Sequence, residues 1–211
     1  MPGTSRDGSP VTLQPPGQEL PKVEHFRSRE RVREQGEVFT QDREIQAMLD
    51  LMPGAFEKLD TTFLEPAAGN GNFLVHIFRR KVELISESSH GGTQRWFEFA
   101  ALRALSSIFA VDIDPRNIDQ ARQRMLDEMR SLSVDGDCLE AAQVILQSTV
   151  VTGDTLSAPQ SIQFIRYQAQ PVERFKRTIE FLEQPEMHLF YEPPGDLADV
   201  HFSELKSAVT Q

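Results

Sequence analysis

Three acidic residues each close a strand-like stretch of the sequence. Glu65 follows the apolar pair at 63–64, Asp112 follows the apolar run at 107–111, and Asp154 follows the stretch at 148–153. A continuous apolar run is typical of a strand that is buried on both faces of a parallel sheet. Ligands of such sheets bind at the carboxyl ends of the strands. We therefore expect the three carboxylates to face one ligand.

A glycine-containing loop follows the first of these acids. Gly69 and Gly71 separate the strand predicted at 63–65 from a helical pattern that begins at Phe73. Glycine permits a positive φ and lets a ligand approach the backbone closely. The dinucleotide-binding pattern G-x-G-x-x-G is incomplete, because Leu74 stands at its third glycine position. The loop therefore predicts a ligand other than an ordinary dinucleotide.

The charge of the three acids narrows the chemistry of that ligand. Carboxylates repel phosphate groups, but they accept hydrogen bonds from hydroxyl and amino groups and attract positive charge. S-adenosylmethionine combines ribose hydroxyls, an exocyclic amine and a positive charge. The site residues thus favour S-adenosylmethionine as the cofactor.

The elements that must position these residues follow the order strand, helix, strand, helix, strand. This order predicts an α/β fold with a doubly wound parallel sheet. Thr40 is expected to cap a helix that presents an apolar face at Ile45, Met48, Leu49 and Met52, and Asp114 is expected to cap the helix that begins at Pro115.

The sequence divides into three parts. Residues 1–21 are rich in proline and glycine and predict a disordered tail. Residues 22–156 form the predicted ligand-binding domain. Residues 157–211 extend it with an antiparallel hairpin at 161–168 and 174–182, for which a helix at 172–183 is the competing prediction, and with one more strand at 187–191.

Composition excludes several classes of protein. Of 211 residues, 39% are hydrophobic and 26% charged, and no apolar run approaches the roughly 18 residues of a membrane span. The net charge of -10 argues against a broad nucleic-acid-binding surface. The single cysteine, Cys138, and the lack of a secretory segment predict a cytoplasmic protein. The five histidines have no metal-ligand spacing, so no metal site is expected.

Four segments together resemble the DNA adenine-N6 methyltransferases of restriction-modification systems. They are GEVFT at 36–40, LEPAAGNGNF at 64–73, AVDID at 110–114 and GDT at 153–155. The resemblance covers about residues 30–156. It implies a class I methyltransferase Rossmann-like sheet, incomplete here because the chain after Asp154 is short for the remaining strands and the DNA-reading region.

The resemblance also implies roles for individual residues. Phe39 and Thr40 would pack against the methionine end of S-adenosylmethionine, Asp112 would accept from the ribose hydroxyls, and Asp154 would accept from the adenine amine. The full implied cofactor set is Phe39, Thr40, Glu65, Pro66, Ala67, Gly69, Gly71, Asn72, Phe73, Asp112, Ile113, Asp154 and Thr155. Taken singly, Asp112 and Asp114 fit a helix cap, Asp154 a turn residue and Phe39 a core residue.

The sequence departs from that family at its catalytic motif. The family carries Asn/Asp/Ser-Pro-Pro-Tyr/Phe, whereas the nearest segment here is Tyr191, Glu192, Pro193 and Pro194. We therefore expect a protein that binds S-adenosylmethionine and either methylates DNA with a partner subunit or is inactive. A non-catalytic binding or assembly module, with a protein partner or as a homo-oligomer, and a methyltransferase of a non-DNA substrate stay open.

Overall fold

A parallel sheet of three strands lies at the centre of the fold. A computed structural model describes residues 40–88, 92–183 and 196–208, all within one compact unit that spans Val38–Gln211. Strands β1 (Phe63–Glu65), β2 (Ile108–Asp112) and β3 (Val150–Thr152) pair in the order β1-β2-β3, all parallel. The three strands therefore end at one edge, as the sequence predicts.

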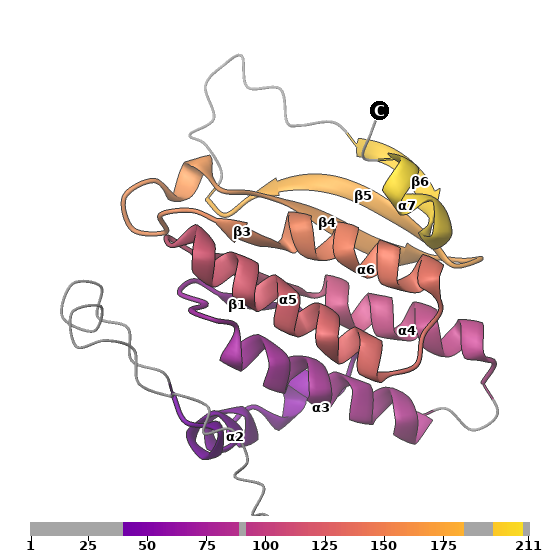
Figure 1. The fold of residues 1–211 in the computed structure, drawn as a ribbon, viewed down its shortest axis with the longest axis horizontal. Helices are drawn as coiled ribbons and strands as arrows, with labels where there is room; N and C mark the ends of the chain where they lie inside the picture. Colours follow the sequence, from indigo (N-terminus) through magenta and orange to yellow (C-terminus); the bar gives the residue numbers. More distant parts are fainter. Residues whose placement is uncertain (1–39, 89–91, 184–195, 209–211) are drawn as a thin grey trace, which may run out of the picture. The chain divides into compact units, whose positions relative to one another are not determined.

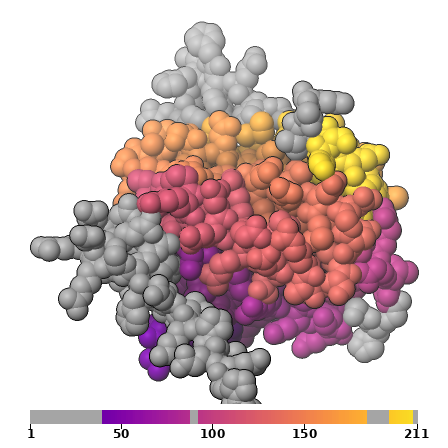
Figure 2. All heavy atoms as spheres, viewed as in Figure 1, coloured from indigo at the N-terminus to yellow at the C-terminus, as the bar shows by residue number. Residues whose placement is uncertain are grey.

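Two helices connect each strand to the next. Helices α3 (Asn72–Ser88) and α4 (Gln94–Ser106) join β1 to β2, and α5 (Pro115–Ser131) and α6 (Gly136–Thr149) join β2 to β3 (Figure 1). Helices α5 and α6 pack against each other and form much of the face seen in Figure 2. No helix within the described residues is long and apolar enough to cross a membrane.

Strand β2 is buried along its whole length, which confirms the prediction from its apolar run. Its side chains alternate between the two faces of the sheet. Ile108 and Ala110 belong to the main apolar core with the helices. Phe109 and Val111 belong to a second cluster with Phe164. The rings of Phe109 and Phe164 meet edge to face, with their centroids 5.2 Å apart. The second face of β2 is thus covered by a strand of another sheet.

That other sheet is antiparallel and C-terminal. Strands β4 (Gln163–Gln170), β5 (Arg174–Phe181) and β6 (Asp196–His201) pair in the order β4-β5-β6. The predicted hairpin is confirmed, and the competing helix at 172–183 is wrong because this segment pairs along its length with β4. Strand β6 was not predicted, and the strand expected at 187–191 lies outside the described residues.

Short elements complete the fold. Helix α2 (Asp42–Asp50) and the 3₁₀ turn η1 (Pro53–Phe56) precede β1, and η2 (Pro159–Ser161) precedes β4. The turn η3 (Phe202–Glu204) and helix α7 (Leu205–Ala208) follow β6. The mixed α/β class is confirmed as a small parallel sheet packed with helices plus a C-terminal antiparallel sheet.

Helix α2 differs from its prediction in two ways. Its cap is Gln41 and not Thr40, because Gln41 and Glu44 form a reciprocal capping box. Ile45 and Leu49 are buried as expected, but the side chain of Met48 is 49% exposed. The apolar face of this helix is therefore narrower than the sequence pattern indicates.

Candidate functional site

The loop after β1 crosses the carboxyl end of β2. The backbone N–H of Ala68 donates to the carbonyl of Val111 at 2.8 Å, and the N–H of Gly69 donates to Oδ2 of Asp112 at 2.7 Å. From the other side, the N–H of Gly153 donates to the carbonyl of Asp112 at 3.0 Å. Asp112 therefore joins the loops that follow β1 and β3.

A further hydrogen bond joins the loop that follows β3 directly to the loop that follows β1. Thr155 Oγ1 donates to the carbonyl of Pro66 at 3.3 Å, although the two residues are 89 positions apart in sequence. The structure thus brings together the segments at 65–69, 112–113 and 153–155, which contain most of the predicted cofactor residues. We call this region the carboxyl edge.

The carboxylate of Asp112 is already hydrogen-bonded within the protein. The residue is 9% exposed. Besides the contact with Gly69, its Oδ1 accepts from the N–H of Asp114 at 2.8 Å and from Nδ2 of Asn117 at 3.0 Å. An ionised carboxylate offers about four acceptor positions, so these three hydrogen bonds leave room for about one more.

The other two predicted carboxylates have different surroundings. Glu65 Oε1 accepts from the N–H of Ala67 at 3.1 Å, and burial raises the pKa of Glu65. Asp154 Oδ1 accepts from the N–H groups of Leu156 at 3.0 Å and Ser157 at 2.8 Å. Hydrogen bonds from Ser157 and Leu156 lower the pKa of Asp154. Asp154 is therefore the ionised acceptor of a tight turn.

The two loop glycines serve the backbone and its packing. Gly69 has φ 52° and Gly71 has φ 81°, both in the left-handed region. A Cβ added at Gly71 would lie 2.8 Å from Cβ of Ala121 in α5. At Gly71, close packing against a helix is thus one reason for glycine, and the expected approach of a ligand stays a prediction.

Arg124 of α5 donates hydrogen bonds to the glycine loop, and no sequence motif predicts this contact. Its Nη1 donates to the carbonyl of Asn70 at 3.1 Å, and its Nη2 donates to Oδ1 of Asn72 at 3.0 Å. Nδ2 of Asn72 donates in turn to the carbonyl of Thr40 at 2.9 Å and to Asp42 at 3.2 Å. Burial lowers the pKa of Arg124. Asn72 therefore holds the start of α2 beside the glycine loop.

Apolar side chains lie open at the carboxyl edge. Ile113 is 66% exposed and Leu156 is 92% exposed, and each follows one of the strand-end acids within two residues. Ile113 was predicted, whereas Leu156 was missed because a lone leucine in a turn carries no pattern. Oδ1 of Asn70, in the glycine loop, is buried without a hydrogen-bond partner. Ile113 and Leu156 can contact an apolar ring of a ligand, and Oδ1 of Asn70 can accept a hydrogen bond from a donor.

The remaining predicted residues fall into two groups. Phe73 packs against the main apolar core, and Asp114 caps α5 by accepting from the N–H of Arg116 at 2.9 Å. Phe39 and the segment Tyr191, Glu192, Pro193 and Pro194 lie outside the described residues. Within the described ranges, no three His, Cys, Asp or Glu side chains gather as metal ligands do.

Comparison with known proteins adds no family to this description. No protein-family model, no curated protein and no solved structure matches the chain.

Proposed function

We propose that the protein binds S-adenosylmethionine at the carboxyl edge and is related in function to the DNA adenine-N6 methyltransferases. One observation carries the proposal. Loops that are far apart in sequence are joined at the ends of the parallel strands, through Gly69 to Asp112 and Thr155 to Pro66, with Ile113 exposed beside them. Ligands of parallel α/β sheets bind at such an edge.

The residues at the edge fit the parts of this cofactor. Ile113 and Leu156 offer apolar surface to the adenine ring, and the remaining acceptor position of Asp112 suits a ribose hydroxyl. Glu65 and the unpaired Oδ1 of Asn70 are acceptors for an ammonium group. When bound, the cofactor supplies an electrophilic methyl group on a sulfonium centre.

Methyl transfer to DNA would depend on a catalytic motif such as the one that the family carries. The only echo of the family's catalytic motif, at 191–194, lies outside the described residues. The proposal is therefore a cytoplasmic protein that binds the cofactor and methylates DNA together with a partner polypeptide, or binds without transfer.

A specific observation favours a second candidate, a non-catalytic assembly module. The contacts of Asp112 with Gly69, Asp114 and Asn117 join the edge through the protein's own groups. In such a module the fold would persist as a scaffold for a protein partner or a second copy of the chain.

Calorimetric titration with S-adenosylmethionine separates the two candidates. Wild-type protein is expected to bind, and Ile113→Ser and Leu156→Ser are each expected to weaken binding about tenfold, because burying one such side chain contributes roughly 1.5 kcal/mol. Both side chains are exposed, so neither change should alter the free energy of unfolding of the ligand-free protein. Val172→Ser is the matched control, since Val172 is 81% exposed in the hairpin turn.

Each outcome decides between the candidates. Binding that is weakened by the two edge variants and not by the control supports the cofactor site. Failure of wild-type protein to bind leaves the assembly module. Incubation with DNA and radiolabelled cofactor then tests transfer by the isolated chain.

A further inference from the structure

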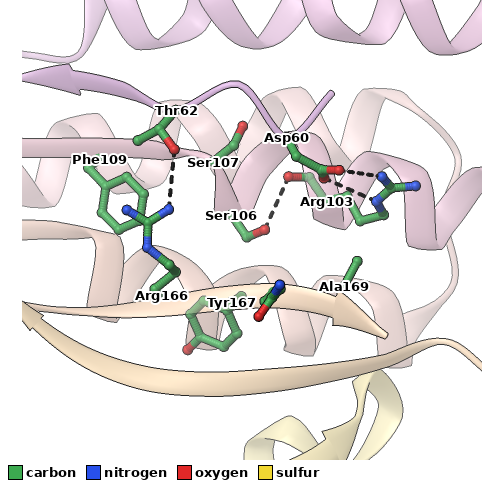
Figure 3. Close-up of a pocket in the computed structure, with 10 residues that line it drawn as sticks. Asp60, Thr62, Arg103, Ser106, Ser107, Phe109, Arg166, Tyr167 and Ala169 are labelled. Carbon is green, nitrogen blue, oxygen red and sulfur yellow. Dashed lines mark hydrogen bonds and ion pairs between the residues drawn. The ribbon is translucent and has the colours of Figure 1, made fainter. Parts of the chain in front are cut away.

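A concave site lies at the edge of the parallel sheet opposite the carboxyl edge. It has a volume of about 440 Å³ and is lined by residues that precede β1 and β2, by the end of α4 and by β4 (Figure 3). Small-molecule pockets typically enclose roughly 300–1,000 Å³. Ser107 precedes β2 and Asp112 ends it, so the length of this strand, roughly 17 Å at the usual rise per residue, separates the two sites. We call this site the amino-edge pocket.

Two arginines line the amino-edge pocket, and the first is held by a forked ion pair. Arg103 of α4 donates from Nε to Oδ1 of Asp60 at 3.2 Å and from Nη2 to Oδ2 of Asp60 at 2.6 Å. Such two-point pairing fixes the plane of the guanidinium group. Figure 3 shows this pair on one side of the pocket.

The second arginine is fixed by three different contacts. The guanidinium carbon of Arg166, in β4, lies 5.7 Å from the ring centroid of Phe109. Its Nε donates to Glu180, and its Nη1 donates to Oγ1 of Thr62 at 3.3 Å. Figure 3 shows Arg166 across the pocket from Arg103. Both cations are therefore held in place before any ligand arrives.

Each guanidinium keeps a donor for a ligand. No hydrogen-bond acceptor among the described residues contacts Nη1 of Arg103 or Nη2 of Arg166. An oxyanion is the group that such donors bind most strongly, and phosphate matches the guanidinium geometry.

Hydroxyl groups on the same wall provide acceptors. Ser106 Oγ donates to the carbonyl of Arg103 at 3.1 Å, and Ser107 Oγ donates to the carbonyl of Ala104 at 2.7 Å. Because their protons are committed to helix carbonyls, these oxygens present lone pairs as acceptors. A ligand with hydroxyl groups could donate to them while its anion contacts the arginines.

We propose that the amino-edge pocket binds a small phosphorylated compound that also carries hydroxyl groups, of the sugar phosphate class. The two guanidinium groups take the phosphate, and the serine oxygens and Asp60 take the hydroxyls. This binding does not depend on the cofactor site at the carboxyl edge.

The test is a calorimetric titration of the full chain with ribose 5-phosphate, with ribose and with inorganic phosphate. We expect ribose 5-phosphate to bind more tightly than inorganic phosphate, and ribose alone to give no measurable heat. Arg103→Gln and Arg166→Gln are each expected to weaken binding of ribose 5-phosphate by about tenfold, since each removes a charged hydrogen bond to the phosphate. Asp60→Asn removes a competing carboxylate and is expected to strengthen inorganic phosphate binding by about threefold.

Arg79→Gln provides the matched control. Arg79 is also paired in a fork, with Glu128 at 2.8 and 2.7 Å, but it lies on α3 outside the pocket. Its substitution should leave binding unchanged. Tighter binding in Asp60→Asn cannot arise from a misfolded variant. Absence of ribose 5-phosphate binding by the wild type, an equal loss in the Arg79 variant, or binding of ribose as tight as that of its phosphate would overturn the proposal.

Discussion

The two edges of the parallel sheet use polar side chains in different ways. At the carboxyl edge, the carboxylate of Asp112 accepts from two backbone N–H groups and from the side chain of Asn117. The exposed side chains there, Ile113 and Leu156, are apolar. At the amino edge, Arg103 and Arg166 form ion pairs, and one Nη of each has no hydrogen-bond acceptor among the described residues.

The charge of Asp112 stabilises the fold, whereas the charges of Arg103 and Arg166 are available to a ligand. Removing a buried carboxylate with three donors around it leaves those donors without partners. Removing an arginine from a partly exposed pair costs less, because solvent hydrates the groups that are left. Substitution of the buried carboxylate at the carboxyl edge should therefore act mainly on stability, and substitution of the arginines at the amino edge should act mainly on binding.

The largest effect is expected from Gly71→Ala in the glycine loop. The left-handed backbone at φ 81° costs a residue with Cβ about 1–2 kcal/mol, and the new Cβ would lie 2.9 Å from the Cα of Ala121. Overpacking of this kind costs a further 1–3 kcal/mol, roughly, because a backbone atom cannot rotate away. Urea unfolding should thus show a loss of about 3 kcal/mol.

Gly136→Ala is the control for this change. Gly136 lies in the first turn of α6, and a Cβ there would meet nothing within 4 Å. Its replacement should raise the free energy of unfolding by up to about 1 kcal/mol. If Gly71→Ala cost no more than the control, α5 would not be packed against the loop as described.

Asp112→Asn tests whether the carboxyl edge depends on this side chain for stability. An amide offers only one acceptor oxygen, and its NH₂ group would face at least one of the three donors that surround Asp112. The expected loss is about 2–3 kcal/mol in the free energy of unfolding, measured by urea titration.

Asp114→Asn is the paired variant for this second prediction. Asp114 caps α5, and asparagine is about as good a cap, so its loss should stay below about 1 kcal/mol. Similar losses for the two variants would mean that Asp112 contributes no more than an ordinary cap, and the contrast between the edges would disappear.

The sequence predicted those parts of the fold that depend on local pattern. The apolar run at 107–111 predicted β2, and the Asp-Pro step predicted the cap at Asp114. The residues of β6 include Asp196 and Asp199, which are rare in strands, and this strand forms because it pairs with β5. Its position depends on a contact between segments that are distant in sequence, which local pattern does not reveal.

The candidate sites were predicted to different extents for the same reason. Strand-end acids and glycines mark the carboxyl edge in the sequence. Arg124 reaches the glycine loop only because α5 packs against it, and no motif marks this arginine. The amino-edge pocket combines Arg103 and Arg166 from distant segments, so only the folded chain reveals it.

The smallest expected effect is the pH dependence of stability that Lys81 causes at the amino edge. Lys81 is fully buried, and its Nζ donates to the carbonyls of Leu59 at 2.6 Å and Thr61 at 2.8 Å, which flank Asp60 of the pocket. Burial lowers the pKa of Lys81 from 10.5 to about 8. The unfolded chain therefore binds more protons than the folded chain between these values, so this residue makes stability rise with pH there.

The measurement is the difference in free energy of unfolding between wild-type protein and Lys81→Met at a series of pH values. This difference should increase in favour of the wild type by about 2 kcal/mol from pH 7.5 to 9.5, because methionine does not titrate. Burial raises the pKa of Cys138 to about 12, which makes stability fall with pH, but both proteins carry this thiol and its effect cancels. A difference that stays constant with pH would mean that Lys81 titrates normally and that water reaches the loop beneath the pocket.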